Sequence, residues 1–178
     1  MTPKGFQSPG RLGLNASIKA VVSALLGIAW YCALLIPPET RAELSGANGR
    51  SPVRLALLMI MTSMVVSVPL WWLLRRRRPV LTCTLGAITP VATAFAFSSF
   101  VYVAEALDYL LRTDNALGPV AAFFDQFEDL VLMYCIGVPV VATVALEQSF
   151  YVALPMGLLH VGAITFLSNR HSKGAGDR

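Results

Sequence analysis

His160 is the residue of this sequence whose type and position most directly suggest chemistry. It lies inside a long apolar run, whereas the other histidine, His171, lies in the polar carboxyl-terminal segment. An ionisable side chain within a membrane span is a functional hypothesis by default, because a charge inside hydrocarbon is costly. A proton relay, a metal ligand or a haem ligand are the functional interpretations. With no second histidine in helical reach, a haem held by two histidines of one chain is excluded.

The alternative for His160 is structural. A neutral imidazole can form hydrogen bonds with hydroxyl groups of neighbouring helices, as polar side chains commonly do inside membranes. The sequence places Ser98, Ser99 and Tyr134 at similar depth in other apolar runs. We expect one of these hydroxyl groups to be the partner, and we favour this structural role over a relay or a ligand.

A second group of chemically capable residues lies in the acidic segment 105–129. Converging carboxylates can bind a divalent cation or act as acid and base. The alternative, which we favour, is a solvated helix face with a local Asp–Arg pair, since no metal-loop spacing is present. The metal-ligand candidates are Glu105, Asp108, Asp125 and Glu128, and the catalytic candidates are His160, Glu128 and Asp129.

Other motifs that would assign an activity are missing from the sequence. There is no phosphate-binding lysine loop, no nucleophile elbow and no zinc-binding His-Glu-x-x-His. The three cysteines (Cys32, Cys83 and Cys135) are isolated in apolar runs, so they form no Cys-x-x-Cys pair. We therefore predict no cofactor.

The composition sets the class of protein in which these residues work. Hydrophobic residues make up 56% of the 178 and charged residues only 13%, and the mean hydropathy is +0.64. A soluble domain carries about 25% charged residues. The composition excludes disorder and argues against a soluble enzyme. Four of the basic residues follow an apolar run directly, which is the pattern of a membrane anchor rather than a nucleic-acid patch.

The elements that must position the candidate residues are membrane helices. We predict an all-α polytopic membrane bundle of five transmembrane helices, with one short interfacial helix in the acidic segment 105–129 and flexible tails at 1–17 and 168–178. Only Glu147–Ser149 separates the last two apolar runs, which predicts a tight antiparallel hairpin. The single membrane domain, 18–167, contains predicted spans at 18–36, 55–74, 79–104, 130–146 and 150–167.

Orientation rests on the basic residues beside the second run. Aromatic residues mark either interface of a span and basic residues mark its cytoplasmic edge. The predicted interface anchors here are Trp71, Trp72, Arg75, Arg76, Arg77 and Arg78. With five spans the lysine and arginine residues divide equally, seven to each side, so this cluster decides. It predicts a cytoplasmic amino terminus and an external carboxyl terminus in a bacterial cytoplasmic membrane. The alternative keeps four spans and makes the last hairpin partly re-entrant, which returns the basic carboxyl-terminal segment to the cytoplasm.

Small residues spaced by four predict close helix packing. Ser149, Ala153 and Gly157 have this spacing in the last run, and small side chains let helix backbones approach. Such faces also serve self-association or a larger membrane complex, which together with the lipid bilayer are the expected partners; nucleic acid is not expected. The favoured function is a non-enzymatic accessory or regulatory subunit that acts through helix–helix contacts. The alternatives are a small transporter or channel subunit with kinked helices and His160, and a membrane-embedded enzyme using the acidic segment.

Overall fold

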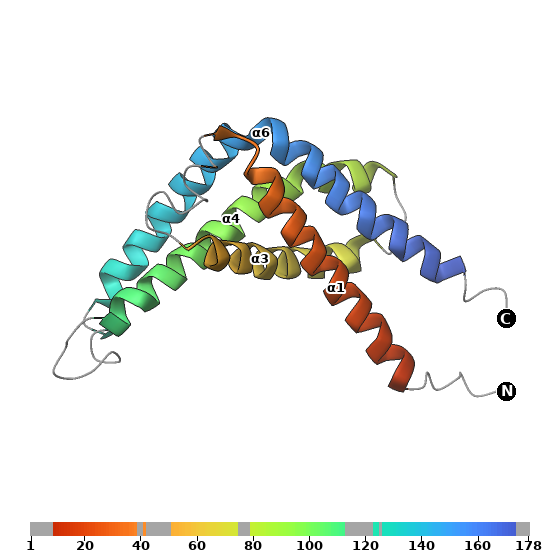
Figure 1. Cartoon of the computed structure of the whole chain (residues 1–178), viewed down its shortest axis with the longest axis horizontal. Helices are drawn as coiled ribbons and strands as arrows, with labels where there is room; N and C mark the ends of the chain where they lie inside the picture. Colours follow the sequence, from red (N-terminus) through yellow and green to blue (C-terminus); the bar gives the residue numbers. More distant parts are fainter. Residues whose placement is uncertain are drawn as a thin grey trace.

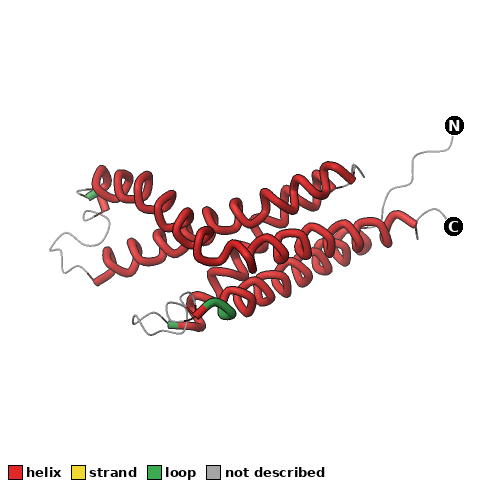
Figure 2. Tube along the Cα trace, turned by 90° about the horizontal axis from the view of Figure 1, so that it is seen from above, coloured by secondary structure: helices red, strands yellow, loops and turns green. Residues whose placement is uncertain are grey.

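The computed structural model describes residues 9–38, 41, 51–74, 79–112, 123–124 and 126–173. In this part the chain is helical apart from short connections (Figures 1 and 2). The all-α class predicted from the sequence agrees with this architecture. The helices are α1 (Pro9–Leu34), α3 (Pro52–Leu73), α4 (Pro79–Arg112) and α6 (Phe127–Lys173).

Each of these four helices contains a stretch long and apolar enough to cross a membrane. Inside hydrocarbon every backbone N–H and C=O must be bonded internally, and an apolar helix achieves this within one segment. The apolar stretches in α1 and α3 are 19 and 22 residues long, which matches a hydrocarbon core of about 30 Å. Proline occupies the first turn of α3 and α4, where its missing N–H has no partner to lose. The described part is thus consistent with a multi-pass membrane protein.

The predicted hairpin in the last apolar region was wrong. A single helix, α6, runs without interruption through Glu147–Ser149, so two separate spans at 130–146 and 150–167 are not seen. Glutamate and glutamine are good helix formers, and the three residues contain no glycine or proline to end the helix. Pro139 and Pro155 lie inside α6, which bends near its middle in Figure 1. The count of five spans is therefore not confirmed.

The other predicted boundaries also shift. Helix α4 continues through the first part of the acidic segment to Arg112, and Phe127–Asp129 belong to the first turn of α6. The remainder of the predicted interfacial helix lies mostly outside the described residues. Helix also extends into both segments that were predicted to be flexible tails, because α1 begins at Pro9 and α6 ends at Lys173. Once a helix is nucleated, polar residues at its ends prolong it at low cost, so hydropathy alone underestimates its length.

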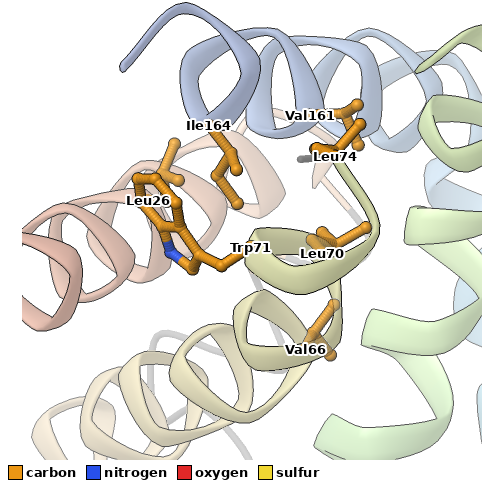
Figure 3. Packing of buried hydrophobic residues seen from close by; sticks show 7 residues of the cluster. All are labelled: Leu26, Val66, Leu70, Trp71, Leu74, Val161 and Ile164. Atoms are coloured by element: carbon orange, nitrogen blue, oxygen red, sulfur yellow. The ribbon is translucent and has the colours of Figure 1, made fainter. Parts of the chain in front are cut away.

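The packing fixes the relative directions of three helices. Lys19, near the start of α1, lies over the ring of Trp71, near the end of α3. In the core cluster of Figure 3, Leu26 of α1 packs with Ile164 of α6. Both α3 and the second half of α6 therefore run antiparallel to α1. The start of α1, the end of α3 and the end of α6 lie at one end of the molecule. The whole cluster consists of Leu26, Val66, Leu70, Trp71, Leu74, Val161 and Ile164.

Candidate functional site

His160 lies at the contact of α1, α3 and the second half of α6. Its side chain is fully buried, with 0% of its surface exposed. The Trp30 indole Nε1–H donates a hydrogen bond to His160 Nδ1 over 3.0 Å, and Ser67 Oγ lies 2.9 Å from His160 Nε2. Both ring nitrogens are therefore engaged, each with a different helix.

The hydrogen-bond network assigns the tautomer of His160. An indole nitrogen is only a donor, so His160 Nδ1 must accept and carries no proton. The Ser67 hydroxyl donates to the Ser63 carbonyl oxygen at 2.6 Å, which leaves its oxygen free to accept from His160 Nε2–H. The imidazole is thus neutral, with its proton on Nε2. A second proton on Nδ1 would face the indole N–H and break that bond.

The network continues along the contact between α1 and α3. Ser63 Oγ donates to the carbonyl oxygen of Ser23 at 2.8 Å, and Trp71 Nε1–H approaches Ser23 Oγ at 3.4 Å. The two helices come close enough for this because Gly27 faces α3: an added Cβ there would stand 2.6 Å from Ile60 Cα. Small residues at this contact therefore bring the polar groups within bonding distance.

The small-residue face of α6 contacts the other three helices. Ser149, Ala153 and Gly157 are all buried. A Cβ added at Gly157 would stand 2.5 Å from the Gly86 carbonyl oxygen and 2.6 Å from Pro90 Cδ, both of α4. Ala153 packs with Trp30 of α1 and Met59 of α3, the two helices that His160 also contacts.

The partners expected for His160 lie elsewhere. Tyr134 donates to Ser99 Oγ at 2.9 Å, and Ser99 donates to the Phe95 carbonyl oxygen at 2.8 Å. Ser98 is buried on α4, where it lines a cavity described below. Depth alone suggested these hydroxyl groups, and it missed Trp30 and Ser67. The spacing of Ser63 and Ser67 could have indicated Ser67 as a partner, because it places two hydroxyl groups on one face of α3.

The acidic candidates do not form a buried site. Asp108 pairs with Arg112 one turn away, at 3.1 Å, and more loosely with Arg54 of α3, at 3.9 Å. Arg54 also donates to the Ala104 carbonyl oxygen at 2.6 Å. These side chains are substantially exposed to the surroundings of the helices, where such pairs contribute at most about 1 kcal/mol.

The remaining acidic candidates that the structure describes lie on α4 and α6. Glu105 is exposed on α4, and Glu128 and Asp129 are exposed in the first turn of α6. Carboxylates there are favourable because the helix N-terminus carries partial positive charge. Asp125 lies outside the described residues. Among the residues that the structure describes, no three His, Cys, Asp or Glu side chains are grouped to hold a metal ion.

The aromatic pair predicted as an interface anchor is divided between two environments. Trp72 is 66% exposed, whereas Trp71 is only 9% exposed and packs in the cluster of Figure 3. Trp71 thus contributes to the core between the helices while Trp72 does not, because adjacent positions on a helix point about 100° apart. The role of the pair as interface anchors stays a prediction. The basic cluster Arg75–Arg78 lies outside the described residues.

The architecture and the network can be set against known proteins. Nothing matches. Family models, curated protein sequences and solved structures all fail to show a relative of this chain. Function is therefore inferred from the residues of this chain and their contacts.

Proposed function

We propose that this chain is a multi-pass protein of a bacterial cytoplasmic membrane and acts as a non-enzymatic accessory or regulatory subunit, through contacts between its helices and another membrane protein. The observation that carries the proposal is the first half of α6. It packs along α4 on one side and leaves large apolar side chains exposed: Leu132, Met133 and Ile136 are 59%, 65% and 59% exposed. These side chains require lipid or a partner helix.

Gly137 favours a partner helix on this surface. An added Cβ at Gly137 would meet no atom within 4 Å, so packing inside the chain does not require glycine there. Glycine in a helix interior costs about 0.5–1 kcal/mol relative to alanine. Glycine on an apolar helix surface lets another helix approach closely in a membrane. A second helix against Gly137 would account for that cost.

The network around His160 supports a role without catalysis or proton transfer. Both imidazole nitrogens are used to join three helices, and the neutral tautomer is fixed by a donor on one side and an acceptor on the other. A relay or ligand needs one nitrogen free to exchange a proton or bind a metal. His160 thus acts as a structural connection.

The helix directions support an orientation with four spans. The start of α1 and the ends of α3 and α6 lie at one end of the molecule. The sequence stretches 1–19, 75–78 and 170–178, which contain or adjoin these helix ends, hold ten of the fourteen lysine and arginine residues. The other four are Arg41, Arg50, Arg54 and Arg112. The positive-inside rule then favours the first end as cytoplasmic. This replaces the external carboxyl terminus expected for five spans, because a continuous α6 removes one reversal of the chain.

Site-directed photocrosslinking in native membranes tests the proposal. A photoreactive residue is placed in turn at positions 131–141 of α6, with position 153, which is buried against the chain itself, as the matched control. We expect protein adducts to recur every three to four positions on the Gly137 side, and Gly137→Leu to abolish them without unfolding the chain. Adducts with lipid alone, on every side of the helix, would overturn the proposal.

A small transporter or channel subunit is the second candidate. It is favoured by an internal cavity where the four helices meet, beside the kink residue Pro90. Reconstituted vesicles that release or take up a solute only with the native chain would support it. His160 does not line this cavity, nor do the acidic residues, so conduction would have to use hydroxyl groups.

A further inference from the structure

The cavity lies between α1, α3, α4 and α6, beside the middle of α6, where that helix bends (Figure 1). Its volume is about 100 Å³, and its lining includes Trp30 of α1, Met59 of α3, Thr93 and Phe97 of α4, and Ser149 and Ala153 of α6. Most of this surface is apolar. Engineered cavities that bind a benzene ring measure about 150 Å³, so this smaller cavity has room for the end of a hydrocarbon chain rather than for a ring.

Thr93 supplies the cavity with an unused hydrogen-bonding group. Its side chain is 3% exposed, and its Oγ1 is buried without a hydrogen-bond partner. Other hydroxyl groups of α4 bond back to their own helix: Thr89 donates to the Leu85 carbonyl oxygen at 2.6 Å, and Thr84 to that of Val80 at 3.0 Å. A buried hydroxyl left unpaired is costly, so Thr93 is a position at which an occupant gains a bond.

The Trp30 and Ser149 side chains beside the cavity already donate hydrogen bonds inside the protein, whereas Ser98 is a second hydroxyl group in the lining. The Trp30 indole N–H is donated to His160, and the Ser149 hydroxyl is donated to the Ala145 carbonyl oxygen. A buried water molecule typically makes about three hydrogen bonds, more than this mainly apolar surface readily offers. An apolar molecule with a single oxygen fits the lining better. Because no lining side chain carries a charge, the occupant should be uncharged.

We propose that this cavity binds the hydrocarbon chain end of an uncharged, lipid-soluble molecule whose hydroxyl or carbonyl oxygen forms a hydrogen bond with Thr93. Such a molecule reaches the cavity from the bilayer. The apolar walls take the hydrocarbon part, and Thr93 selects for the oxygen. This site goes beyond the proposed subunit function and does not depend on it, since its lining does not include Gly137, Leu132, Met133 or Ile136.

Bromine quenching of Trp30 fluorescence tests the site. The full chain carries Trp71→Phe and Trp72→Phe, so that Trp30 alone reports, and its folding is checked by circular dichroism. The probes are 3-bromo-1-propanol and 1-bromopropane, which differ by one hydroxyl group. We expect saturable quenching by both, with the alcohol bound roughly fivefold more tightly, the ratio that one neutral hydrogen bond supplies.

Three variants make the test decisive. Thr93→Val should remove the preference for the alcohol and leave the affinity for 1-bromopropane unchanged, whereas Thr93→Ser should retain the preference. Ala145→Leu, which fills the cavity from α6, should abolish saturation by both probes. Unchanged saturation in Ala145→Leu, or an equal affinity for the two probes in the native cavity, would overturn the proposal. If the tryptophan background fails to fold, saturation-transfer NMR of the same two probes on the native chain gives the same comparison.

Discussion

Replacing His160 separates a structural connection from a functional group, and the structure sets the magnitude. His160→Leu keeps the apolar volume but removes both hydrogen bonds. Ser67 still donates to the Ser63 carbonyl oxygen, so it loses only an accepted bond. Trp30, which is 2% exposed, is left with a buried indole N–H that has no acceptor. An unsatisfied buried donor costs about 1–3 kcal/mol, and hydrogen bonds between membrane helices average about 0.6 kcal/mol. We expect a loss of about 1–3 kcal/mol.

His160→Gln is the matched control. The glutamine carbonyl oxygen can accept from Trp30, and its amide N–H can donate to Ser67, which reproduces the polarity of the neutral imidazole. We expect it to cost less than 1 kcal/mol, about the value of an imperfectly placed bond. Trp30→Phe should cost about as much as His160→Leu, and the double variant should cost less than the sum, because both changes remove the same bond.

Reversible unfolding in mixed micelles, followed by circular dichroism, measures these differences. The native chain and the four variants are titrated with denaturing detergent under identical conditions. Equal losses for the glutamine and leucine variants would refute the assignment of donor and acceptor. A fully stable His160→Leu variant would show that the network contributes nothing to folding.

Two further predictions concern packing and orientation. Gly157→Leu should lower the melting temperature in detergent more than Leu158→Ala, since a Cβ at Gly157 meets the Gly86 carbonyl oxygen at 2.5 Å whereas Leu158 is 46% exposed; the reverse order would mean that this face of α6 does not pack on α4. In a chain without its native cysteines, single cysteines at positions 77 and 172 should resist an impermeant thiol reagent in intact cells while one at position 115 reacts. Labelling at 172 as well as 115, with 77 still protected, would restore the five-span orientation.

The sequence predicted the class of the fold because that class follows from composition. Long apolar runs must be helical in hydrocarbon, and the runs in α1 and α3 were recognised on this basis. The course of α6 was not predictable in the same way. Glu147 and Gln148 look like a loop on a hydropathy scale, yet they are compatible with a helix, and only packing against α4 and α1 decides between the two.

The candidate site was predictable in its centre but not in its partners. His160 was identified because an ionisable residue in an apolar run is rare. Its partners depend on helix directions and on rotation about each helix axis, which spacing within one run does not specify. The acidic residues were grouped by sequence distance, whereas the structure disperses those it describes along the surfaces of two helices.

The network around His160 affects the order in which the helices can make their contacts during synthesis. The Ser63–Ser23 bond joins residues 40 positions apart, whereas Trp30 and His160 are 130 positions apart. During synthesis α1 and α3 can therefore pair early, while the indole N–H of Trp30 has no acceptor until α6 has been made. Distant contacts of this kind are the slowest to form. His160 is thus the last residue of the network to be synthesised. A chain interrupted before α6 would contain a pair of helices, α1 and α3, with an unsatisfied indole N–H inside the membrane. Unfinished and finished molecules differ in this feature.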